Sequence, residues 1–222
     1  MSQTHHEFDF AALTAREAYK VMIGTIVPRP IAWVTTISPD GVVNAAPYSF
    51  FNCLSADPPI LALGVENKPD RSYKDTAYNI RMTECFTVNI VDRANVEAMA
   101  ITAAGFSPEV DELQMAGLTS APGVRVACPR IAEAPVAFEC ERYLGIAVSS
   151  EREIILGRIV MAHIREDIID PATHYSDHAR LDAIGRMGGS GYAGTLDYFD
   201  WPTPSAEEVL SRPQKRSASG GG

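Results

Sequence analysis

The chain has no closely spaced cysteine pair, no excess of positive charge and no apolar run long enough to cross a bilayer. Its four cysteines form no C-x-x-C pair, which argues against structural zinc and against a disulfide framework. The formal charge of −9 disfavours broad electrostatic binding of nucleic acid or anionic lipid. No run approaches the ~20 apolar residues that a membrane helix needs, and residues 1–7 lack the pattern of a secretory signal. We therefore expect a cytoplasmic protein with reduced thiols, without membrane or nucleic-acid partners.

Motifs for nucleophilic or metal chemistry are also missing. No serine or cysteine lies in a nucleophile motif, which makes a hydrolase the least favoured class. The five glycines of residues 185–194 do not form G-x-G-x-x-G between a strand and a helix, so a dinucleotide-binding fold is not supported. The pair His5-His6 supplies too few ligands for a metal, and the spacing of His174 and His178 is more typical of a loop. We predict no metal site and no catalytic side chain of these kinds.

The individual cysteines are expected to serve packing. Cys85 and Cys140 lie in β-type runs, where a free cysteine behaves as a small apolar residue. Cys53 follows a polar and aromatic stretch, and packing is again favoured over reactivity.

The order of the expected elements favours a mainly β protein with short helical additions. Thr14 and Glu17 form a capping box that begins a helix, and Gly24 is expected to end it. Strands are expected at 31–37, 42–51, 60–65, 86–91, 136–149 and 151–165, with helices at 71–81, capped by Asp70, and at 95–102. Asp40-Gly41 marks a tight hairpin turn between the first two strands. Because strands do not alternate with helices, an antiparallel barrel is favoured over a doubly wound sheet.

The chain divides into an extension at 1–13, one domain at 14–201 and a tail at 202–222. Residues 105–130, called the excursion below, lack periodicity, and a functional lid and a plain surface loop remain equally open. Residues 196–201 are expected to close the fold. The Pro-, Ser-, Glu- and Gly-rich tail after them is expected to be disordered.

Residues 29–52 carry most of the functional signal. Two β-rich segments flank the hairpin turn, and the second ends in the small, aromatic and hydrogen-bonding residues of 44–52 (NAAPYSFFN). Small side chains let a ligand approach the backbone closely, so this stretch suits a wall for a flat ligand with polar edges.

Several ordered fragments resemble one known family. They are VPRPIAWV at 27–34, NAAPYSFFN at 44–52, DPP at 57–59, KDT at 74–76 with Asn79-Ile80, FTVN at 86–89, GRIV at 157–160 with His163, and RMGG at 186–189 with Tyr192. In this order they resemble the flavin reductase-like proteins with an FMN-binding split barrel, including flavoredoxins and reductase components of two-component monooxygenases. The resemblance implies a split antiparallel barrel, a homodimer, and FMN rather than FAD near the subunit interface, with its ring along the first hairpin.

The resemblance also implies which residues hold the cofactor. The implied cofactor-binding residues are Arg29, Trp33, Ala46, Pro47, Tyr48, Ser49, Asn52, Ser55, Lys74 and Thr76. Lys74 and Thr76 lie near the start of an expected helix, where a phosphate is favoured. Roles unrelated to a ligand stay open for three of these residues. Arg29 would then be a surface charge, Trp33 a core residue and Lys74 a solvated cation.

A second group of residues is implied for the substrate side. The resemblance assigns Gly188, Gly189 and Tyr192 to the nicotinamide side of the ring. His163 has a possible role near the cofactor, against a structural hydrogen-bonding role.

The implied activity is electron transfer from NAD(P)H through flavin to free flavin or another acceptor. The flavin would perform the chemistry, because hydride transfer needs orientation more than a protein acid or base. A flavoredoxin-type electron carrier and a flavin-binding protein without turnover remain alternatives. A partner monooxygenase or an electron-acceptor protein is a further implied partner.

Overall fold

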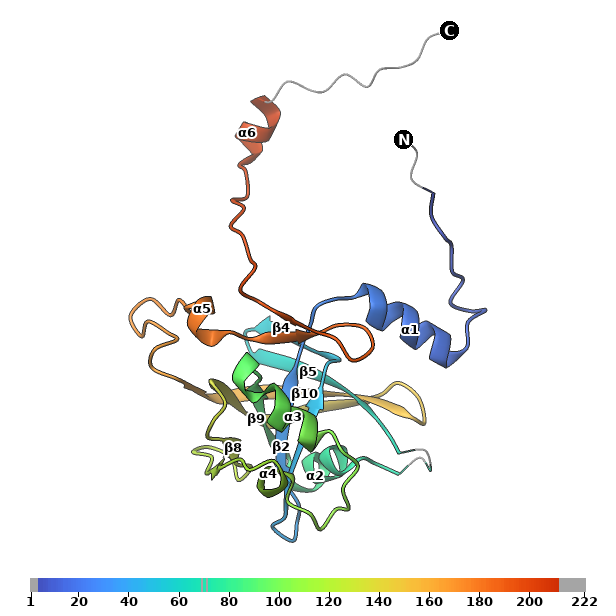
Figure 1. The fold of residues 1–222 in the computed structure, drawn as a ribbon, viewed down its shortest axis with the longest axis vertical. Coiled ribbons are helices and arrows are strands. Elements are labelled where there is room, and N and C mark those ends of the chain that lie inside the picture. The colour runs from blue at the N-terminus through green and yellow to red at the C-terminus, as the bar shows by residue number, and fades with distance from the viewer. Residues whose placement is uncertain (1–3, 69, 71, 212–222) are drawn as a thin grey trace.

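The computed structural model describes residues 4–68, 70 and 72–211, and its centre is a curled antiparallel sheet (Figure 1). The sheet has seven strands in the order β3-β2-β6-β9-β10-β5-β4. The strands are β2 (Ala32–Ile37), β3 (Val43–Tyr48), β4 (Phe51–Ala56), β5 (Pro59–Glu66), β6 (Cys85–Ile90), β9 (Val136–Ala147) and β10 (Arg152–Ile164). Because β3 also contacts β5, the sheet curls around one core. The expected antiparallel β architecture is confirmed.

Strand β2 is buried on both of its faces along nearly its whole length. Ala32 and Val34 point into the barrel, where they pack with Leu63 and other apolar residues. Trp33 points the other way, into a second cluster with Met99 of helix α3 (Val96–Thr102). Alternation along a strand sends neighbouring side chains to opposite faces, so β2 separates the two cores.

The barrel interior is filled by Phe86, and Gly157 leaves room for it. A Cβ on Gly157 would lie 2.3 Å from Cζ of Phe86, far inside van der Waals contact. The pairing of β10 with β9 also shifts register between Leu156 and Gly157. The glycine therefore permits both the irregularity and the close aromatic contact.

The second expected strand, 42–51, proves to be two strands. β3 pairs with β2 as far as Tyr48 opposite Ala32, whereas β4 pairs with β5 from Phe51 opposite Leu63. The chain thus changes its partner at 49–50. A continuous run of strand-forming residues could not reveal this change, since it depends on the position of β5.

Helix α1 (Ala15–Thr25) has the expected capping box. The Thr14 hydroxyl accepts from the Glu17 N–H, and the Glu17 carboxylate accepts from the Thr14 N–H at 2.9 Å. The helix runs one residue past Gly24. The Thr25 hydroxyl donates to the Val21 carbonyl at 2.7 Å.

Helix α2 (Asp75–Thr83) begins later than expected. Asp70 does not cap it, because its carboxylate accepts from the N–H and hydroxyl of Ser72. The N-cap is Lys74, which makes no side-chain cap hydrogen bond. The expected helix at 95–102 is confirmed as a short 3₁₀ turn, η1 (Arg93–Asn95), followed by α3.

The excursion is tied to the barrel. It contains α4 (Glu112–Met115) and β7 (Ser120–Ala121), and β7 pairs with β8 (Arg130–Ile131). The buried carboxylate of Glu139 accepts hydrogen bonds from three successive N–H groups, those of residues 124–126. Such bonds fix a segment that has little regular structure of its own.

The C-terminal part forms a small sheet and then an arm. β1 (Arg29–Pro30), β11 (Ile184–Arg186) and β12 (Tyr192–Gly194) form a three-stranded sheet, preceded by α5 (His178–Leu181). Residues 195–211, the C-terminal arm, then leave the barrel (Figure 1). Phe199 and Trp201 are each 82% exposed, so the expectation that 196–201 closes this fold is wrong.

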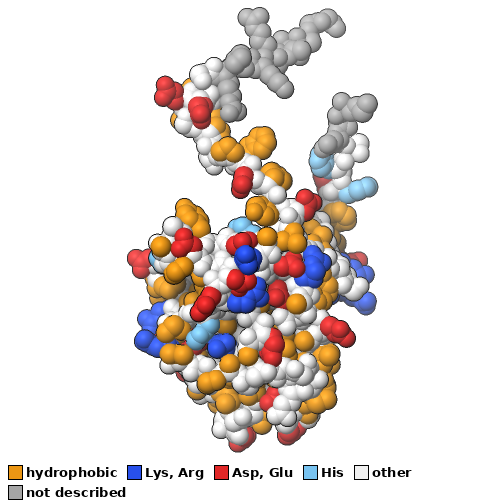
Figure 2. All heavy atoms as spheres, turned by 60° about the vertical axis from the view of Figure 1, so that its left-hand side comes forward, with side chains coloured by type: hydrophobic (Ala, Val, Ile, Leu, Met, Phe, Trp, Pro, Cys, Tyr) orange, Lys and Arg blue, Asp and Glu red, His pale blue; other side chains and the backbone are white. Residues whose placement is uncertain are grey.

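Apolar side chains follow the C-terminal arm (Figure 2). Its end carries α6 (Ala206–Ser211), which buries none of its residues, and the expectation of a disordered tail stays a prediction. Residues 212–222 lie outside the described part of the chain. Across 4–68, 70 and 72–211, no helix combines the length and the apolar character that a membrane crossing requires.

Candidate functional site

Two adjoining pockets meet at the end of β3. The larger, about 780 Å³, lies between α1 and strands β4, β5 and β10. The smaller, about 390 Å³, lies between β3, the start of α2, residues 102–106 and Glu112. Pro47, Tyr48 and Lys74 line both pockets. The arrangement can hold one elongated ligand with a bulky part on one side of β3 and a small polar part on the other.

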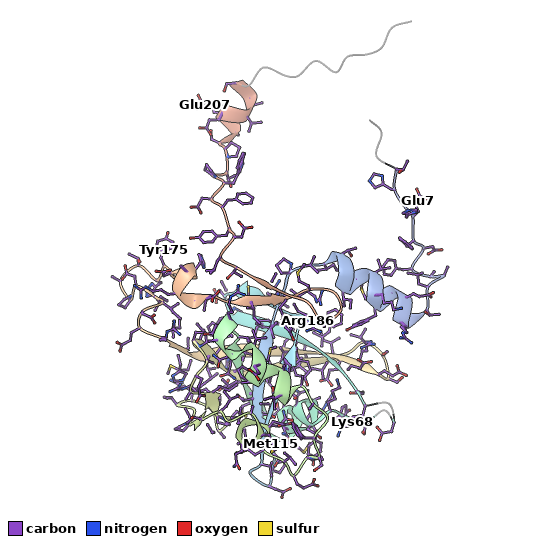
Figure 3. The ribbon with its side chains drawn as sticks, viewed as in Figure 1. Glu7, Lys68, Met115, Tyr175, Arg186 and Glu207 are labelled. Carbon is purple, nitrogen blue, oxygen red and sulfur yellow. The ribbon has the colours of Figure 1, made fainter. Side chains whose placement is uncertain are left out.

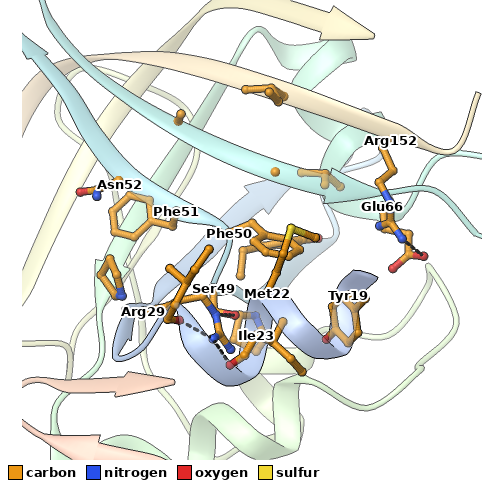
Figure 4. A pocket seen from close by; sticks show the side chains of 18 of the residues that line it. Tyr19, Met22, Ile23, Arg29, Ser49, Phe50, Phe51, Asn52, Glu66 and Arg152 are labelled. Atoms are coloured by element: carbon orange, nitrogen blue, oxygen red, sulfur yellow. Dashed lines mark hydrogen bonds and ion pairs between the residues drawn. The ribbon is translucent and has the colours of Figure 1, made fainter. Parts of the chain in front are cut away.

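The larger pocket has apolar walls and a charged edge (Figure 4). Tyr19 and Met22 of α1 face Phe50, and the rings of Tyr19 and Phe50 meet edge to face with centroids 6.2 Å apart. Arg152 and Glu66 form an ion pair of 3.1 Å at the far end. A planar aromatic ligand would find flat apolar support here and polar groups near its rim.

Arg29 is buried in the wall of the larger pocket and is fully engaged with the protein. It is 6% exposed, and it donates to the carbonyls of Ile23 at 2.7 Å, Ile26 at 2.9 Å and Met187 at 3.1 Å. Its Nε also donates to the Ser49 hydroxyl at 3.4 Å. No carboxylate of the described residues pairs with it. Arg29 therefore joins the end of α1, the β11–β12 hairpin and the end of β3, and it adds positive charge to the wall.

The smaller pocket is built at the N-terminus of α2. A helix N-terminus carries unpaired N–H groups and partial positive charge, and Lys74 adds a full charge there. Thr76 is 1% exposed, and its hydroxyl accepts from Nδ2 of Asn44 at 3.0 Å, so it forms the floor of the pocket. Lys68 lines the same pocket, paired with Asp75 at 3.0 Å. These features suit a phosphate group.

Two ionisable groups in these walls have raised pKa values. Burial raises the pKa of Tyr48 to about 12, with the Thr76 hydroxyl opposing the shift. Burial likewise raises the pKa of Glu112 to about 7, although its carboxylate accepts the N–H of Ala45 at 2.8 Å. At neutral pH the Tyr48 phenol remains neutral, and Glu112 titrates.

The pocket walls include eight of the residues named from sequence. These are Arg29, Ala46, Pro47, Tyr48, Ser49, Asn52, Lys74 and Thr76. Residues 46–49, at the end of β3, form a wall that the two pockets share.

Trp33 and Ser55 lie elsewhere. Trp33 is fully buried, and its Nε1 donates to the Thr102 hydroxyl at 2.9 Å. Trp33 therefore lies outside both pockets, because its position in β2 directs it into the second core, which is the core alternative named from sequence. The Ser55 hydroxyl accepts from the N–H of Asp57 at 3.2 Å in the β4–β5 turn, away from both pockets.

The residues named for the nicotinamide side form part of the β11–β12 hairpin. The Arg186 guanidinium lies over the ring of Tyr192, 4.6 Å from its centroid, and Figure 3 shows Arg186 on the side of the barrel where α1 lies. A Cβ on Gly188 would lie 3.4 Å from Cα of Gly24 in α1. Among the described residues of a single chain, Gly188, Gly189 and Tyr192 line neither of the two pockets.

His163 has the structural role. Its Nε2 lies 2.6 Å from Oε1 of Glu139, the carboxylate that holds residues 124–126. Burial acts to raise the pKa of Glu139, but the hydrogen bonds from His163 and from those three N–H groups outweigh it and lower the pKa to about 2. His163 thus helps to anchor the excursion.

Cys53 corrects the packing expectation, whereas Cys85 and Cys140 are buried as expected. Cys53 is exposed because β4 is an edge strand whose side chains mostly face outward.

Sequence reasoning missed one wall of each pocket. Residues 103–106 and Glu112 close the smaller pocket. The larger pocket is closed by Tyr19, Met22 and Ile23 of α1 and by Ile26, which follows the helix. The apolar spacing on α1 was a usable signal, since the helix buries none of its residues and yet carries an apolar stripe. Glu112 had no such signal.

Comparison with known proteins agrees with this architecture. The model of the "Flavin reductase like domain" matches residues 23–181. Nitrilotriacetate monooxygenase component B from Bacillus cereus superimposes with a TM-score of 0.85 at 31% identity, covering 90% of this chain and 100% of that one. The 2-nitrobenzoate 2-nitroreductase NbaA of Pseudomonas fluorescens gives 0.82 at 34% identity, covering 90% and 98%. A protein of Deinococcus radiodurans is 41% identical over 206 residues, 90% of this chain and 89% of its own length.

Fold, site and comparisons together define a split-barrel flavoprotein of the oxidoreductase class. The chain belongs to the flavin reductase-like family.

Proposed function

We propose that this protein binds FMN across the two pockets and passes electrons from NAD(P)H through the flavin to free flavin or another acceptor. The observation that carries the proposal is the pair of pockets joined at Pro47, Tyr48 and Lys74. One pocket is large and mainly apolar, and the other is small and polar, with Lys74 beside the N-terminus of α2, as the two ends of FMN require. When bound, FMN supplies the redox chemistry.

The residues of this chain would bind and orient the cofactor. Lys74 and the α2 N-terminus would neutralise the phosphate, while Thr76 and Asn44 fix the floor of its pocket. The backbone of residues 46–49 would meet the polar edge of the ring. Met22 and Phe50 would support its apolar face.

No protein acid or base is required at the ring. Hydride transfer depends on distance and orientation, and the neutral Tyr48 phenol adds no charge to the wall. Arg29 places positive charge beside the larger pocket, which would favour the anionic form of a reduced flavin.

We further propose that the working unit is a homodimer. Gly188, Gly189 and Tyr192 lie outside the pockets of their own chain, so a second copy could bring such a hairpin to the ring. Large apolar residues are also exposed on α1 and on the C-terminal arm, including Tyr19, Ile26, Phe199 and Trp201. A stable dimer would bury such side chains.

The test begins with purified full-length protein and FMN. The proposal predicts a yellow complex that bleaches when NADH or NADPH is added without oxygen. Lys74→Ala should weaken FMN binding, and Lys20→Ala, a solvated lysine on α1, serves as the matched control. Protein that takes up no FMN would overturn the proposal, whereas FMN binding without bleaching would favour an electron carrier or a binding protein.

A further inference from the structure

Two cysteines outside the pockets lie against each other. Sγ of Cys85 and Sγ of Cys128 are 3.1 Å apart, although 43 positions separate them in the chain. Cys85 begins β6, and Cys128 lies near the end of the excursion. Since a disulfide bond is ~2.05 Å long, the two sulfur atoms need approach by only about 1 Å to bond.

The backbone on both sides is already fixed. β6 pairs with β2 and β9. The Cys128 carbonyl accepts from the Thr87 hydroxyl at 3.2 Å, and the N–H of Ile131 donates to Oδ1 of Asn89 at 2.9 Å. With Glu139 holding residues 124–126, bond formation would need side-chain rotation and little movement of the chain.

The two thiols are not equivalent. The hydrogen bond from Cys128 favours the Cys85 thiolate and lowers the pKa of Cys85. The same contact, together with burial, raises the pKa of Cys128. Cys85 is 6% exposed and Cys128 is 0% exposed, so a small oxidant would meet Cys85 first.

We propose that Cys85 and Cys128 form a dithiol that hydrogen peroxide oxidises to a disulfide. The Cys85 thiolate attacks one peroxide oxygen, which breaks the O–O bond and, after protonation of the leaving hydroxide, gives a sulfenic acid and water. Sγ of Cys128 then attacks the Cys85 sulfur, and the departing hydroxide takes the Cys128 proton to leave as a second water. Two thiols lose two electrons and one peroxide becomes two waters.

Peroxide also has a source near this protein. Reduced flavin reacts with dioxygen to give hydrogen peroxide. This source of peroxide rests on the proposed function, whereas the contact between Cys85 and Cys128 does not. The disulfide would join β6 to the excursion, whose earlier residues Phe106 and Glu112 line the smaller pocket. We therefore expect the oxidised protein to unfold at a higher temperature than the reduced protein.

The experiment uses full-length protein reduced with dithiothreitol and then freed of it. The protein is treated with increasing concentrations of hydrogen peroxide and then unfolded in the presence of N-ethylmaleimide, which alkylates the remaining thiols. Mass spectrometry then measures the mass of the intact protein and of its peptides after digestion without reductant. We expect loss of two maleimide adducts, one cross-linked peptide pair containing Cys85 and Cys128, and reversal by dithiothreitol. The pair should react about tenfold faster than Cys140, whose pKa is raised by burial.

Matched variants separate the pair from the other thiols. Cys53→Ser and Cys140→Ser should still form the cross-link, whereas Cys128→Ser should stop at a sulfenic acid that dimedone traps. Peroxide that oxidises exposed Cys53 but leaves Cys85 and Cys128 open to alkylation would overturn the proposal, as would cross-links through other cysteines. This wild-type pattern decides the matter even if a variant fails to fold. Because peroxide is added, the result is independent of flavin binding.

Discussion

Arg29 and Lys74 carry the same charge and line the same large pocket, yet they stand at opposite kinds of helix end. Arg29 meets the C-terminus of α1, where carbonyl oxygens point outward and accept its N–H groups. Lys74 stands at the N-terminus of α2, where N–H groups point outward and no side chain caps them. The macrodipole favours a cation at the first end and an anion at the second. Arg29 is therefore satisfied by its own protein, whereas Lys74 lies where an anion is favoured and, in our proposal, binds the phosphate of FMN.

The largest effect should follow from removing the cation at the α1 end. Arg29→Ala leaves the buried carbonyls of Ile23, Ile26 and Met187 without their hydrogen-bond donor. This loss should lower the free energy of unfolding by about 3 kcal/mol. Urea unfolding followed by circular dichroism measures the loss. Arg16→Ala, exposed at the start of the same helix, should change stability by less than ~0.5 kcal/mol. Equal losses in the two variants would remove the distinction between the two helix ends.

The reverse pattern is expected at the α2 end. Lys74→Ala should leave the unfolding free energy within ~0.5 kcal/mol of wild type but raise the Kd for FMN about tenfold, ~1.4 kcal/mol. Fluorescence titration of the apoprotein measures the Kd, with Lys20→Ala as control. An unchanged Kd with lost stability would show that Lys74 is structural, as Arg29 is.

Two buried carboxyls should give opposite pH dependence. The pKa of Glu112 is raised to about 7 in the folded state, so its contribution to stability is present below its unfolded value and is lost as pH rises toward 7. The pKa of Glu139 is lowered to about 2, so its contribution is present above its unfolded value and is lost as pH falls toward 2. Urea unfolding of Glu112→Gln and Glu139→Gln gives the free energy of unfolding of each variant at a series of pH values. Subtracting each from the wild-type value shows how the contribution of that carboxyl changes with pH. Slopes of the same sign would contradict these environments.

The smallest effect is expected at the hairpin that Arg29 supports. Tyr192→Ala should raise the KM for the nicotinamide about threefold while the Kd for FMN stays unchanged, because Tyr192 would contact only the substrate side of the ring. Steady-state oxidation of NADH and NADPH gives the KM. Tyr175→Ala, an exposed tyrosine before α5, is the control. If Tyr192→Ala instead weakens FMN binding, the assignment of the hairpin fails.

Local chemistry predicted much of this molecule. The capping box at Thr14, the hairpin turn at Asp40-Gly41 and the apolar runs of the strands act over a few residues, and each lies where it was expected, apart from the division of 42–51 between β3 and β4. Lys74 also lies near a helix start as expected, and its phosphate-binding role stays a prediction. These features depend on neighbours in the chain.

What escaped prediction depends on distant residues. The resemblance assigned Trp33 to the cofactor with core packing left open, since alternation alone does not say which face of β2 meets a ligand and which meets α3. Arg29 was implied as a cofactor-binding residue, with a surface charge as the alternative, and neither reading included its hydrogen bonds to the carbonyls of Ile23, Ile26 and Met187. Glu112 enters the site only because the excursion folds back on β3. The contact of Cys85 with Cys128 likewise spans the sequence.

The most direct test is the crystal structure of the protein soaked with FMN. The account predicts phosphate oxygens within hydrogen-bonding distance of Lys74 and the first N–H groups of α2, with the ring beside residues 46–49 and Phe50. A ring bound elsewhere, or a wall at 46–49 covered by the protein's own side chains, would contradict it.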